Sequence, residues 1–487
     1  MANSHAELAG RATEAALDGA ARAARDPRRL AYHFMPPSGW MNDPNGLIQW
    51  QGSYHVFYQH NPYAPDWGAM HWGHATSGDL VHYEHQPVAL APSEAYERAE
   101  GGGGGCFSGS AVDDDGTLTL IYTATAEHQT QCIATSTDGV AFTKCADNPV
   151  IAGPPPEGRP GDFRDPKVWR HGGSWYMVVG SREGERGNVL LFRSENLRRW
   201  DYVGVACESD GSQGRMWECP DLFPLGDRHL LVVSPIGVER RKSITLVGDF
   251  DYGTGRFTPE RQMDTDCGPG FYAPQSFVDG RGRRIMIGWM IGGGADCPNK
   301  KHGWDGAHTL PRVVSILPDG AVGFQPLPEL ESLRRGHRQL RDVGLVPGAE
   351  HMFSDLAGDV LEIKARFEAA PAGRGRFGLA VRCSADGEQL TRVLYEARTA
   401  SLTLDGRLSG AAPEGTSSAP LPLLPGGVLD LHVFVDRSSV EVFANGGRRV
   451  LSSRIFPHPD SVGVRLCCEG AQARLRTLDA WELEPVG

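Results

Sequence analysis

The sequence lacks the features of several large classes of protein. No apolar run approaches the ~18 residues that a membrane-spanning helix requires, which excludes a helical membrane protein. The net charge of −12 is opposite in sign to the basic surface that nucleic-acid binding needs. We therefore expect an acidic soluble protein with a neutral or weakly charged partner, and neither nucleic acid nor membrane as a partner.

Disulfide-scaffold and leader signals are also missing. Ten cysteines in 487 residues, with no CxxC pair, do not form a disulfide framework. The first thirty residues contain no apolar stretch of ~7–15 residues, as a secretory signal would. Residues 1–30 are instead alanine-rich with near-helical spacing, and predict a short helix ending before Pro27. A transit peptide is the alternative for this segment, but the acidic residues of the segment argue against it. Together with the cysteine content, this leads us to expect a cytoplasmic protein with reduced thiols.

Glycine is abundant, and a turn pattern recurs. The chain has 62 Gly, or about one in eight against a usual ~7%, and 34 Pro, which predicts many turns and few long helices. A small polar residue, a turn and then an aromatic residue appear together at 77–83, 136–142 and 194–200, with weaker copies at 248–257 and 318–324. The successive aromatic residues are 59, 58, 57 and 67 positions apart: Tyr83, Phe142, Trp200, Phe257 and Phe324.

Short runs rich in Val, Ile and aromatic residues lie between these turns, at 54–58, 118–122, 175–179, 230–233 and 284–289. Each run is typical of a β-strand. A repeat of ~58 residues with about four short strands is the size of one propeller blade. We therefore predict an all-β fold with a five-bladed β-propeller over 31–326. An irregular β-rich domain with chance repeats is the alternative.

The sequence pattern changes near residue 350. Strand-like runs become closer and alternate apolar with polar residues, as at 361–367, 429–435 and 440–443. Asn445-Gly446-Gly447 is a hairpin-turn signal. The spacing predicts a C-terminal β-sandwich over 351–487, with 327–350 as a linker and 411–427 as an internal loop.

Three acidic residues stand out by their neighbours. Asp43 lies in WMNDPNG (40–46), where Pro44 favours an extended conformation and Gly46 permits a reversal. Asp165 lies in FRDP (163–166), beside Arg164. Glu218 lies in MWECPD (216–221), among apolar neighbours that favour a protonated carboxyl. A capping aspartate, a surface ion pair and a structural buried carboxyl are the respective alternatives.

The inner strand ends of a propeller converge on one funnel, so carboxyl groups far apart in sequence can meet there. Paired carboxyls are the usual equipment of glycoside hydrolysis. Aromatic residues crowd the same segments and offer flat apolar faces to sugar rings: Trp40, Trp67, Trp72, Phe107 and Trp217.

These motifs resemble those of the family 32 glycoside hydrolases, which include invertases, sucrose-6-phosphate hydrolases and fructanases. The resemblance covers about 33–484. It rests on WMNDPNG (40–46), YQHNPYAPDWGAMHWGHATSGDLVHY (58–83), FSGS (107–110), FRDPKVW (163–169), WECPDLF (217–223), FYAPQSF (271–277) and DRSSVEVFANGG (436–447). It implies a five-bladed propeller followed by a β-sandwich, independently of the repeat.

The resemblance also implies roles for individual residues. Asp43 matches the nucleophile, Glu218 the general acid/base, and Asp165 with Arg164 the pair that grips fructose hydroxyls. The other implied or neighbouring substrate-binding residues are Trp40, Asn42, Gln59, Trp67, Phe107, Ser108, Tyr272 and Trp289. We expect Asp43 to be kept ionised by amide donors and by Arg164. The implied activity is retaining hydrolysis of the fructosyl bond of sucrose or short fructo-oligosaccharides.

The resemblance implies no cofactor, and His71, His74 and His82 lack the ligand spacing of a metal site. Sucrose 6-phosphate as substrate, fructosyl transfer to a sugar, and homo-oligomers stay open. A phosphate would need cations at the rim, for which the candidates are Arg182, Arg215, Arg240, Arg241 and Lys242. The run Gly101–Gly105 predicts a flexible rim loop of unknown effect.

Overall fold

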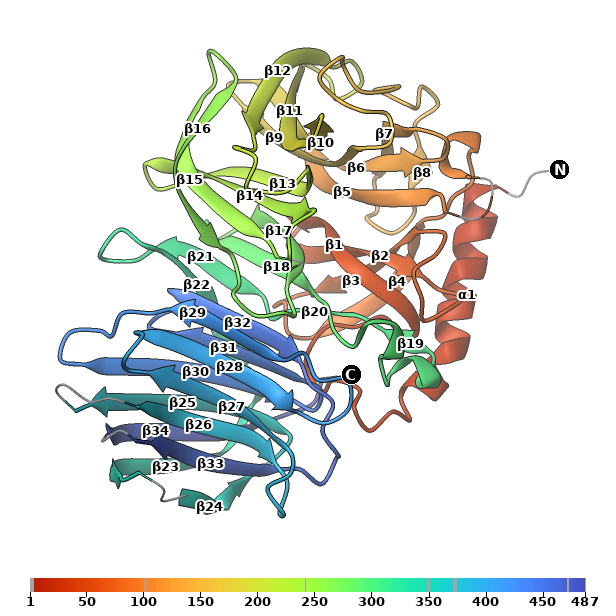
Figure 1. Cartoon of the computed structure of the whole chain (residues 1–487). Helices are drawn as coiled ribbons and strands as arrows, with labels where there is room; N and C mark the ends of the chain where they lie inside the picture. Colours follow the sequence, from red (N-terminus) through yellow and green to blue (C-terminus); the bar gives the residue numbers. More distant parts are fainter. Residues whose placement is uncertain are drawn as a thin grey trace.

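The computed structural model describes residues 4–99, 101, 103–240, 242–347, 351–370, 375–470 and 473–486, with the backbone alone at 351–355. One helix, α1 (His5–Ala23), accompanies two β modules that lie side by side in Figure 1. Arg241 and Gly102, which belong to two of the sequence predictions, lie outside the described residues. Within the described residues no helix has the length and apolarity needed to cross a membrane.

The first module consists of five sheets, whose strands follow in spatial order. The first sheet is β19 (Trp304–Asp305), β1 (Gly39–Trp50), β2 (Ser53–Asn61), β3 (His71–Ser77) and β4 (Tyr83–Leu90). The second is β5 (Gly105–Asp114), β6 (Thr117–Thr125), β7 (Gln129–Ser136) and β8 (Thr143–Lys144). The third, from its inner edge, is β9 (Phe163–His171), β10 (Ser174–Glu183), β11 (Arg186–Ser194) and β12 (Asp201–Glu208).

The fourth sheet is β13 (Met216–Leu225), β14 (Arg228–Ile236), β15 (Ile244–Asp251) and β16 (Arg256–Asp264). The fifth is β17 (Tyr272–Val278), β18 (Arg284–Met290), β21 (Arg312–Ile316) and β22 (Val322–Pro326), with β20 (Ala307–His308) also paired to β18. Short 3₁₀ turns are η1 (Ala95–Glu97), η2 (Gly294–Asp296), η3 (Lys300–His302) and η4 (Pro328–Leu333).

The inner strands of these sheets form a closed ring. β1 packs beside β5, β5 beside β9, β9 beside β13, β13 beside β17, and β17 beside β1. The strand-like runs seen in the sequence are the second strands, β2, β6, β10, β14 and β18, which are buried on both sides. The recurring turn connects the third strand to the fourth in every sheet, as from β3 to β4. The molecule thus contains the predicted β-propeller, with as many sheets as the repeat has copies.

Every inner strand contains a β-bulge, at which its pairing register with the second strand of its sheet shifts. Register shifts lie between Met41 and Pro44 in β1, Cys106 and Gly109 in β5, and Arg164 and Lys167 in β9. The same occurs between Glu218 and Asp221 in β13 and between Tyr272 and Gln275 in β17. Such bulges re-aim side chains that a regular strand would hold in the sheet. In this ring they direct one short segment of each inner strand towards the centre.

The second module is a sandwich of two six-stranded sheets. One is β23 (Arg334–Leu345), β34 (Ala473–Leu483), β25 (Val360–Ala369), β30 (Val428–Asp436), β31 (Ser439–Ala444) and β32 (Arg449–Arg454). The other is β24 (His351–Ala357), β33 (Gly463–Glu469), β26 (Arg376–Cys383), β27 (Leu390–Glu396), β28 (Ser401–Leu408) and β29 (Thr416–Pro420). A single large apolar cluster between them forms the core.

Part of the predicted linker belongs to this sandwich. Residues 334–345 form β23, which pairs antiparallel with β34. The strand was missed because it lies at the sheet edge with most of its side chains exposed, so its sequence is charged rather than alternating.

The N-terminal helix covers the outer strand of the first sheet. Ser4 and Glu7 form a capping box at its start. Ala9 and Ala12 pack on Val88 and Ala91 at the end of β4, where small side chains allow close approach. In Figure 1 the helix lies along β4 at the margin of the propeller. The surface helix predicted from the sequence is thus confirmed.

A buried network of charges joins the two modules. His33 contacts Asp436 through Nδ1 at 2.8 Å and Glu441 through Nε2 at 3.0 Å. Arg312 Nη2 lies 2.7 Å from Glu441 and 2.9 Å from Asp266. The motif 436–447 therefore lies at the interface between the modules. Burial alone would lower the pKa of His33, but its hydrogen bonds and the charges of both carboxylates raise it to about 9.

The network defines a pH window for stability. The His33 contribution is complete below its ordinary value near 6.5 and is lost as the pH rises through about 9. Burial opposes ionisation of Glu441, but the charge of Arg312 and the hydrogen bond from His33 lower its pKa to about 2. The contribution of Glu441 is complete above about 4.5 and is lost as the pH falls through about 2.

Removing Glu441 should therefore destabilise the protein strongly. Glu441→Ala removes one of the two buried carboxylate partners of His33 and one of the two of Arg312, so the free energy of unfolding should fall by about 3–5 kcal/mol in urea titrations near neutral pH. The control is Asp249→Ala, which breaks an exposed pair with Arg228 and should leave the free energy of unfolding nearly unchanged. Equal losses in the two variants would contradict the structural role of the network.

Candidate functional site

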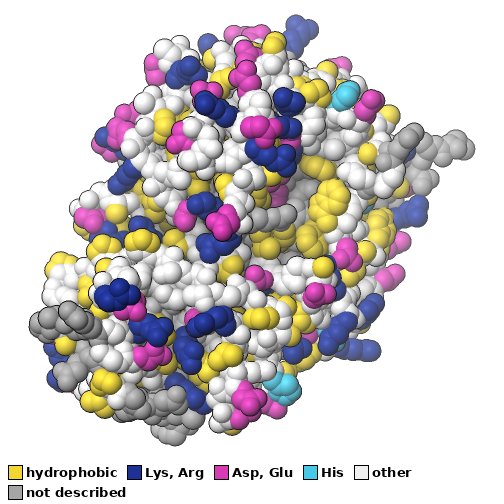
Figure 2. Space-filling model, in the orientation of Figure 1, with side chains coloured by type: hydrophobic (Ala, Val, Ile, Leu, Met, Phe, Trp, Pro, Cys, Tyr) yellow, Lys and Arg dark blue, Asp and Glu magenta, His cyan; other side chains and the backbone are white. Residues whose placement is uncertain are grey.

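One cavity of about 580 Å³ opens at the centre of the ring of inner strands. All twelve residues that the sequence nominated line it: Trp40, Asn42, Asp43, Gln59, Trp67, Phe107, Ser108, Arg164, Asp165, Glu218, Tyr272 and Trp289. On the face shown in Figure 2, hydrophobic side chains gather in a hollow over this part of the propeller. Side chains that lie in or next to the bulges of all five inner strands thus meet in one site. The propeller topology predicts this convergence.

Asp43 lies in the bulge of β1, and two neutral donors hold its carboxyl group. Ser108 Oγ donates to Oδ2 at 2.6 Å, and Asn42 Nδ2 donates to Oδ1 at 3.1 Å. Asn42 is itself oriented by Trp40, whose indole N–H donates to its side-chain oxygen at 2.8 Å. Desolvation raises the pKa of Asp43 to about 6, aided by the negative charge of Glu218 and opposed by the two donors.

Asp165 lies in the bulge of β9 with a left-handed φ of 67°. Its backbone N–H donates to Thr123, and its Oδ2 accepts from the backbone N–H of Cys219 at 2.9 Å. The Cys219 thiol lies 3.5 Å from Asp165 Oδ2 and 3.6 Å from Asp43 Oδ2. Desolvation raises the pKa of Asp165 to about 7 despite the adjacent guanidinium of Arg164, with smaller contributions from Glu218 and Asp43. The backbone of Asp165, which directly precedes Pro166, is therefore left-handed and strained rather than extended.

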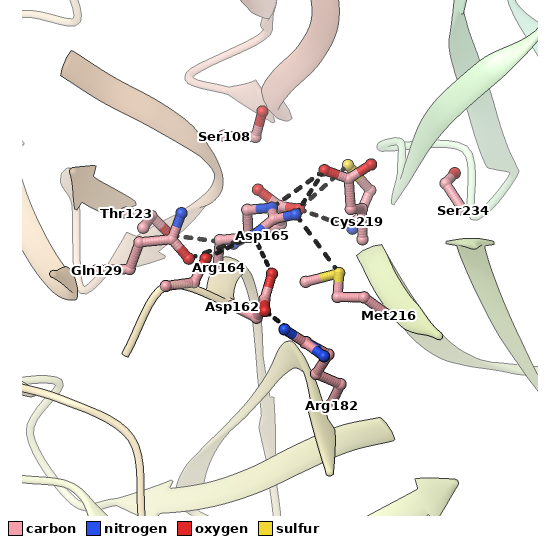
Figure 3. Close-up of polar contacts among 12 residues, drawn as sticks. Ser108, Thr123, Gln129, Asp162, Arg164, Asp165, Arg182, Met216, Cys219 and Ser234 are labelled. Atoms are coloured by element: carbon pink, nitrogen blue, oxygen red, sulfur yellow. Dashed lines mark hydrogen bonds and ion pairs between the residues drawn. The ribbon is translucent and has the colours of Figure 1, made fainter. Parts of the chain in front are cut away.

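Glu218 accepts hydrogen bonds at both of its oxygens. Arg164 donates to Oε1 through Nε and Nη2, each at 3.0 Å, and Tyr272 Oη donates to Oε2 at 2.7 Å. Figure 3 shows Arg164 at the centre of this cluster, with Gln129, Asp162 and Met216 around it. A polar environment therefore surrounds a carboxyl whose sequence neighbours are mostly apolar.

The expected partners of Asp43 are correct in one part and wrong in the other. The Asn42 amide donates to Asp43 as expected, but Arg164 pairs with Glu218, and the other side chains that donate to Asp43 are Ser108 and the Cys219 thiol. Trp72 and Trp217 are fully buried core residues rather than cavity walls, and their indole N–H groups donate to backbone oxygens. Trp217 directly precedes Glu218 in β13, and successive side chains of a strand point to opposite faces, so Trp217 faces away from the site.

The remaining aromatic residues line the cavity at different depths, from the exposed Trp67 to the buried Tyr272 and Trp289. Trp67 is 50% exposed and meets Phe107 edge-on with ring centroids 6.0 Å apart. Trp40 meets Trp289 edge-on at 5.8 Å on another part of the wall. Gln59 is buried deeper, and its amide donates to the backbone oxygen of Cys106 at 2.9 Å. The cavity therefore offers aromatic faces at several depths beside its carboxyl groups.

Sequence reasoning missed several residues of the site. Gln129, Asp162 and Ile236 also line the cavity, and the Cys219 thiol contacts two of its carboxyl groups. Arg215 lines it too, and the sequence had already indicated this residue as a candidate phosphate contact at the rim. Asp162 and Cys219 are close in sequence to Arg164 and Glu218, which was a usable signal. Gln129 begins the third strand of its blade and carries no motif, so nothing in the sequence indicated it.

Within the described residues, no group of three or more His, Cys, Asp or Glu side chains has the arrangement to bind a metal ion. His71 and His74 are buried in β3, whereas His82 is exposed and contacts Asp79.

Models of known families match nearly the whole chain. The model described as glycosyl hydrolases family 32 N-terminal domain matches residues 33–325. The model described as glycosyl hydrolases family 32 C terminal matches residues 329–482. Together they cover both modules of the structure.

Individual relatives agree with these matches. A sucrose-6-phosphate hydrolase of Escherichia coli is 40% identical over an alignment of 476 residues, with 93% of this chain and 94% of that protein covered. A raffinose invertase of Escherichia coli is 39% identical over 471 residues, with 93% and 94% covered. Among solved structures, a mutant β-fructofuranosidase of Bombyx mori in complex with sucrose has 32% identity and a TM-score of 0.84, with 98% of this chain and 99% of that chain covered.

The donors around Asp43 make a testable prediction about its titration. Ser108→Ala removes a hydrogen bond to the ionised form, so the pKa of Asp43 should rise above about 6, by up to about one unit for a bond of ~1 kcal/mol. Carbon-13 NMR of labelled aspartate would follow the titration. Ser110→Ala, on the same strand but bonded to Pro166, is the matched control and should leave Asp43 unchanged.

Proposed function

Because this chain belongs to glycosyl hydrolase family 32, we propose that it is a retaining β-fructofuranosidase of the invertase type. Its substrates are sucrose and short fructo-oligosaccharides, whose fructosyl bond it hydrolyses. The observation that carries the proposal is the meeting of Asp43, Asp165 and Glu218 in one aromatic-lined cavity. Two carboxyl groups suffice for double displacement, and the third is available to bind hydroxyls.

Asp43 is the nucleophile in this proposal. Its ionised carboxylate attacks the anomeric C2 of the fructosyl unit, and the bond from C2 to the leaving-group oxygen breaks. A covalent fructosyl ester of Asp43 forms. The hydrogen bonds from Ser108 and Asn42 fix both carboxylate oxygens and oppose the rise in pKa that desolvation causes.

Glu218 is the general acid and then the general base. Its proton passes to the leaving-group oxygen as the first bond breaks. Water then attacks C2 of the ester, gives a proton to Glu218 and releases the Asp43 carboxylate. Two inversions at C2 retain the configuration. Tyr272 and Arg164 hold the Glu218 carboxyl in place through both steps.

Asp165 and Arg164 grip the fructosyl hydroxyls, and the amides and aromatic rings complete the subsite for this sugar. A carboxylate bonded to hydroxyls also stabilises the positive charge that develops at C2 in the transition state. Asn42 and Gln59 offer amide groups, whereas Trp40, Trp67 and Phe107 offer apolar faces. No step needs a metal or an organic cofactor.

Sucrose 6-phosphate is the alternative substrate, and its phosphate would need cations near the leaving group. Arg215 is exposed and lines the cavity, which favours this alternative. Arg182 is bound to Asp162, and Lys242 to Asp264. Arg240 lines a neighbouring cavity with Lys242 and donates to Cys267 and Ser417.

A fructosyltransferase would use the same three carboxyl groups. A cytoplasmic location and a homo-oligomeric state stay predictions.

Loss of the nucleophile should abolish turnover. Asp43→Asn keeps the shape of the side chain but cannot form the ester, so kcat for sucrose should fall more than about a thousandfold while the thermal unfolding midpoint stays close to that of the wild type. Steady-state assays of released fructose measure this. Activity within tenfold of wild type would sink the assignment of Asp43.

Loss of the acid should depend on the leaving group. Glu218→Gln cannot donate a proton, so kcat/KM should fall far more for sucrose than for an aryl fructoside whose leaving group needs little protonation. Parallel assays with the two substrates give the ratio. If both values fall by the same factor, Glu218 is not the general acid.

A further inference from the structure

The segment that follows η3 runs beside the strand that carries Asp43. β19 pairs parallel with the start of β1, and β20 also packs beside β1. Gly306, between β19 and β20, has a φ of 88°, and a Cβ atom added to it would lie 1.9 Å from the backbone oxygen of Met41. Continued two residues further in the same direction, this contact brings His308 level with Asp43, in the bulge of β1.

The His308 ring is buried on the core side of this bulge. The residue is 1% exposed and is not one of those that line the central cavity. Its ring packs against Phe34 with centroids 5.5 Å apart and meets Tyr58 edge-on at 6.3 Å. Tyr58 pairs in turn with Pro44, the residue that ends the bulge. His308 therefore lies behind the Asp43 backbone, away from the substrate.

The imidazole of His308 is a neutral donor with nearby acceptors in the bulge. Desolvation lowers the pKa of His308 to about 3, and the backbone groups of Asn42 and Asp43 oppose this shift, which indicates that their oxygens lie close to the ring. A neutral imidazole carries one N–H donor. Both ring nitrogens are buried, and within the described residues neither makes a hydrogen bond of good geometry. A buried donor without an acceptor is costly, so a small closing movement of the bulge towards the ring is favoured.

Both modules hold the segment that carries His308. The backbone N–H of His308 donates to the backbone oxygen of Phe34 at 2.9 Å, and Phe34 directly follows His33 of the interface network. The backbone N–H of Leu310 donates to Glu441 Oε1 at 2.7 Å. The backbone on both sides of the ring is thus fixed before any substrate binds, as a group that orients another group must be.

We propose that His308 is a positioning residue for the nucleophile: its imidazole N–H donates to a backbone oxygen of the bulge at Asn42 and Asp43, and this bond tightens when the fructosyl unit fills the cavity. The bond holds the Asp43 carboxylate in line with the anomeric C2. This role rests on the proposed fructosidase function. It also gives the interface network a path to the chemistry, because Glu441 and His33 hold the segment that carries the ring.

Substitutions at position 308 separate the donor from the ring. His308→Phe keeps a ring packed on Phe34 and Tyr58 but removes both nitrogens, so kcat for sucrose should fall about 10–100-fold, as for a nucleophile displaced by ~1 Å, while KM changes less than about threefold. His308→Asn and His308→Gln offer an amide N–H near the places of Nδ1 and Nε2. One of these two variants should recover most of the lost kcat. If His308→Phe does not fold, His308→Met is the donor-free replacement.

The titration of Asp43 gives a second measure of its position. A loosened bulge weakens the side-chain hydrogen bonds to the ionised carboxylate, so the pKa of Asp43 should rise above about 6 in His308→Phe. The acid limb of kcat/KM should then move to higher pH by roughly half a unit. The titratable groups that face the two residues are the same in every variant: Asp165, Glu218 and Cys219 around Asp43, and Tyr58 beside His308.

The matched control is His74→Phe, which changes an equally buried histidine of the same blade. His74 stacks on Phe57 with centroids 4.2 Å apart and contacts His55 through Nε2, outside the cavity wall. Its kcat and acid limb should equal those of wild type.

Three results would overturn the positioning role: kcat within threefold of wild type in His308→Phe, equal losses in the phenyl and both amide variants, or an unchanged pKa of Asp43. Carbon-13 NMR of labelled aspartate reads this pKa without turnover. A wild type inert towards sucrose, in which the pKa of Asp43 still rises on His308→Phe, would overturn the fructosidase function but support the hold of His308 on the Asp43 carboxyl.

Discussion

Four carboxyl groups, those of Asp43, Asp162, Asp165 and Glu218, line one cavity, and the guanidinium of Arg164 lies among them. The rest of the site follows from that shortage of positive charge. Arg164 is committed to Glu218 and Asp162. Asp43 and Asp165 are consequently held by neutral donors, and desolvation raises the pKa of both. Asp43, the proposed nucleophile, with its pKa near 6 is mainly ionised at neutral pH yet more basic than an exposed aspartate, which suits attack on carbon.

The bulges of the inner strands are the structural means of gathering these groups. A regular strand presents alternate side chains to two sheet faces, and neither face of an inner strand looks along the axis of the ring. One irregular step in each strand releases a few residues from that constraint. Asp165, Cys219 and Ala273 take left-handed φ values in three of these steps, each directly before a proline. Strain of this kind persists because the surrounding sheets hold the backbone on both sides.

The sequence predicted the architecture better than the electrostatics. Turn spacing located the propeller and its second strands, because those strands are buried on both faces and read as apolar runs. The edge strand β23 escaped, since its exposed residues carry no such pattern. All twelve predicted site residues line the cavity, but the sequence did not indicate the partner of Arg164, the contacts of Cys219 or the contribution of Gln129. Those depend on distances between blades, which no local pattern encodes.

The tie between the first and last parts of the chain has a consequence for biosynthesis. The backbone N–H of Ala31 finds its acceptor in Asp436, which lies 405 residues later. At ~5–20 residues per second, about 20–80 s separate the synthesis of the two groups on the ribosome. β1 likewise waits for its parallel neighbour β19, at Trp304–Asp305. The first blade therefore emerges with an unfinished edge and an untethered segment before it, and the partners of both are made much later.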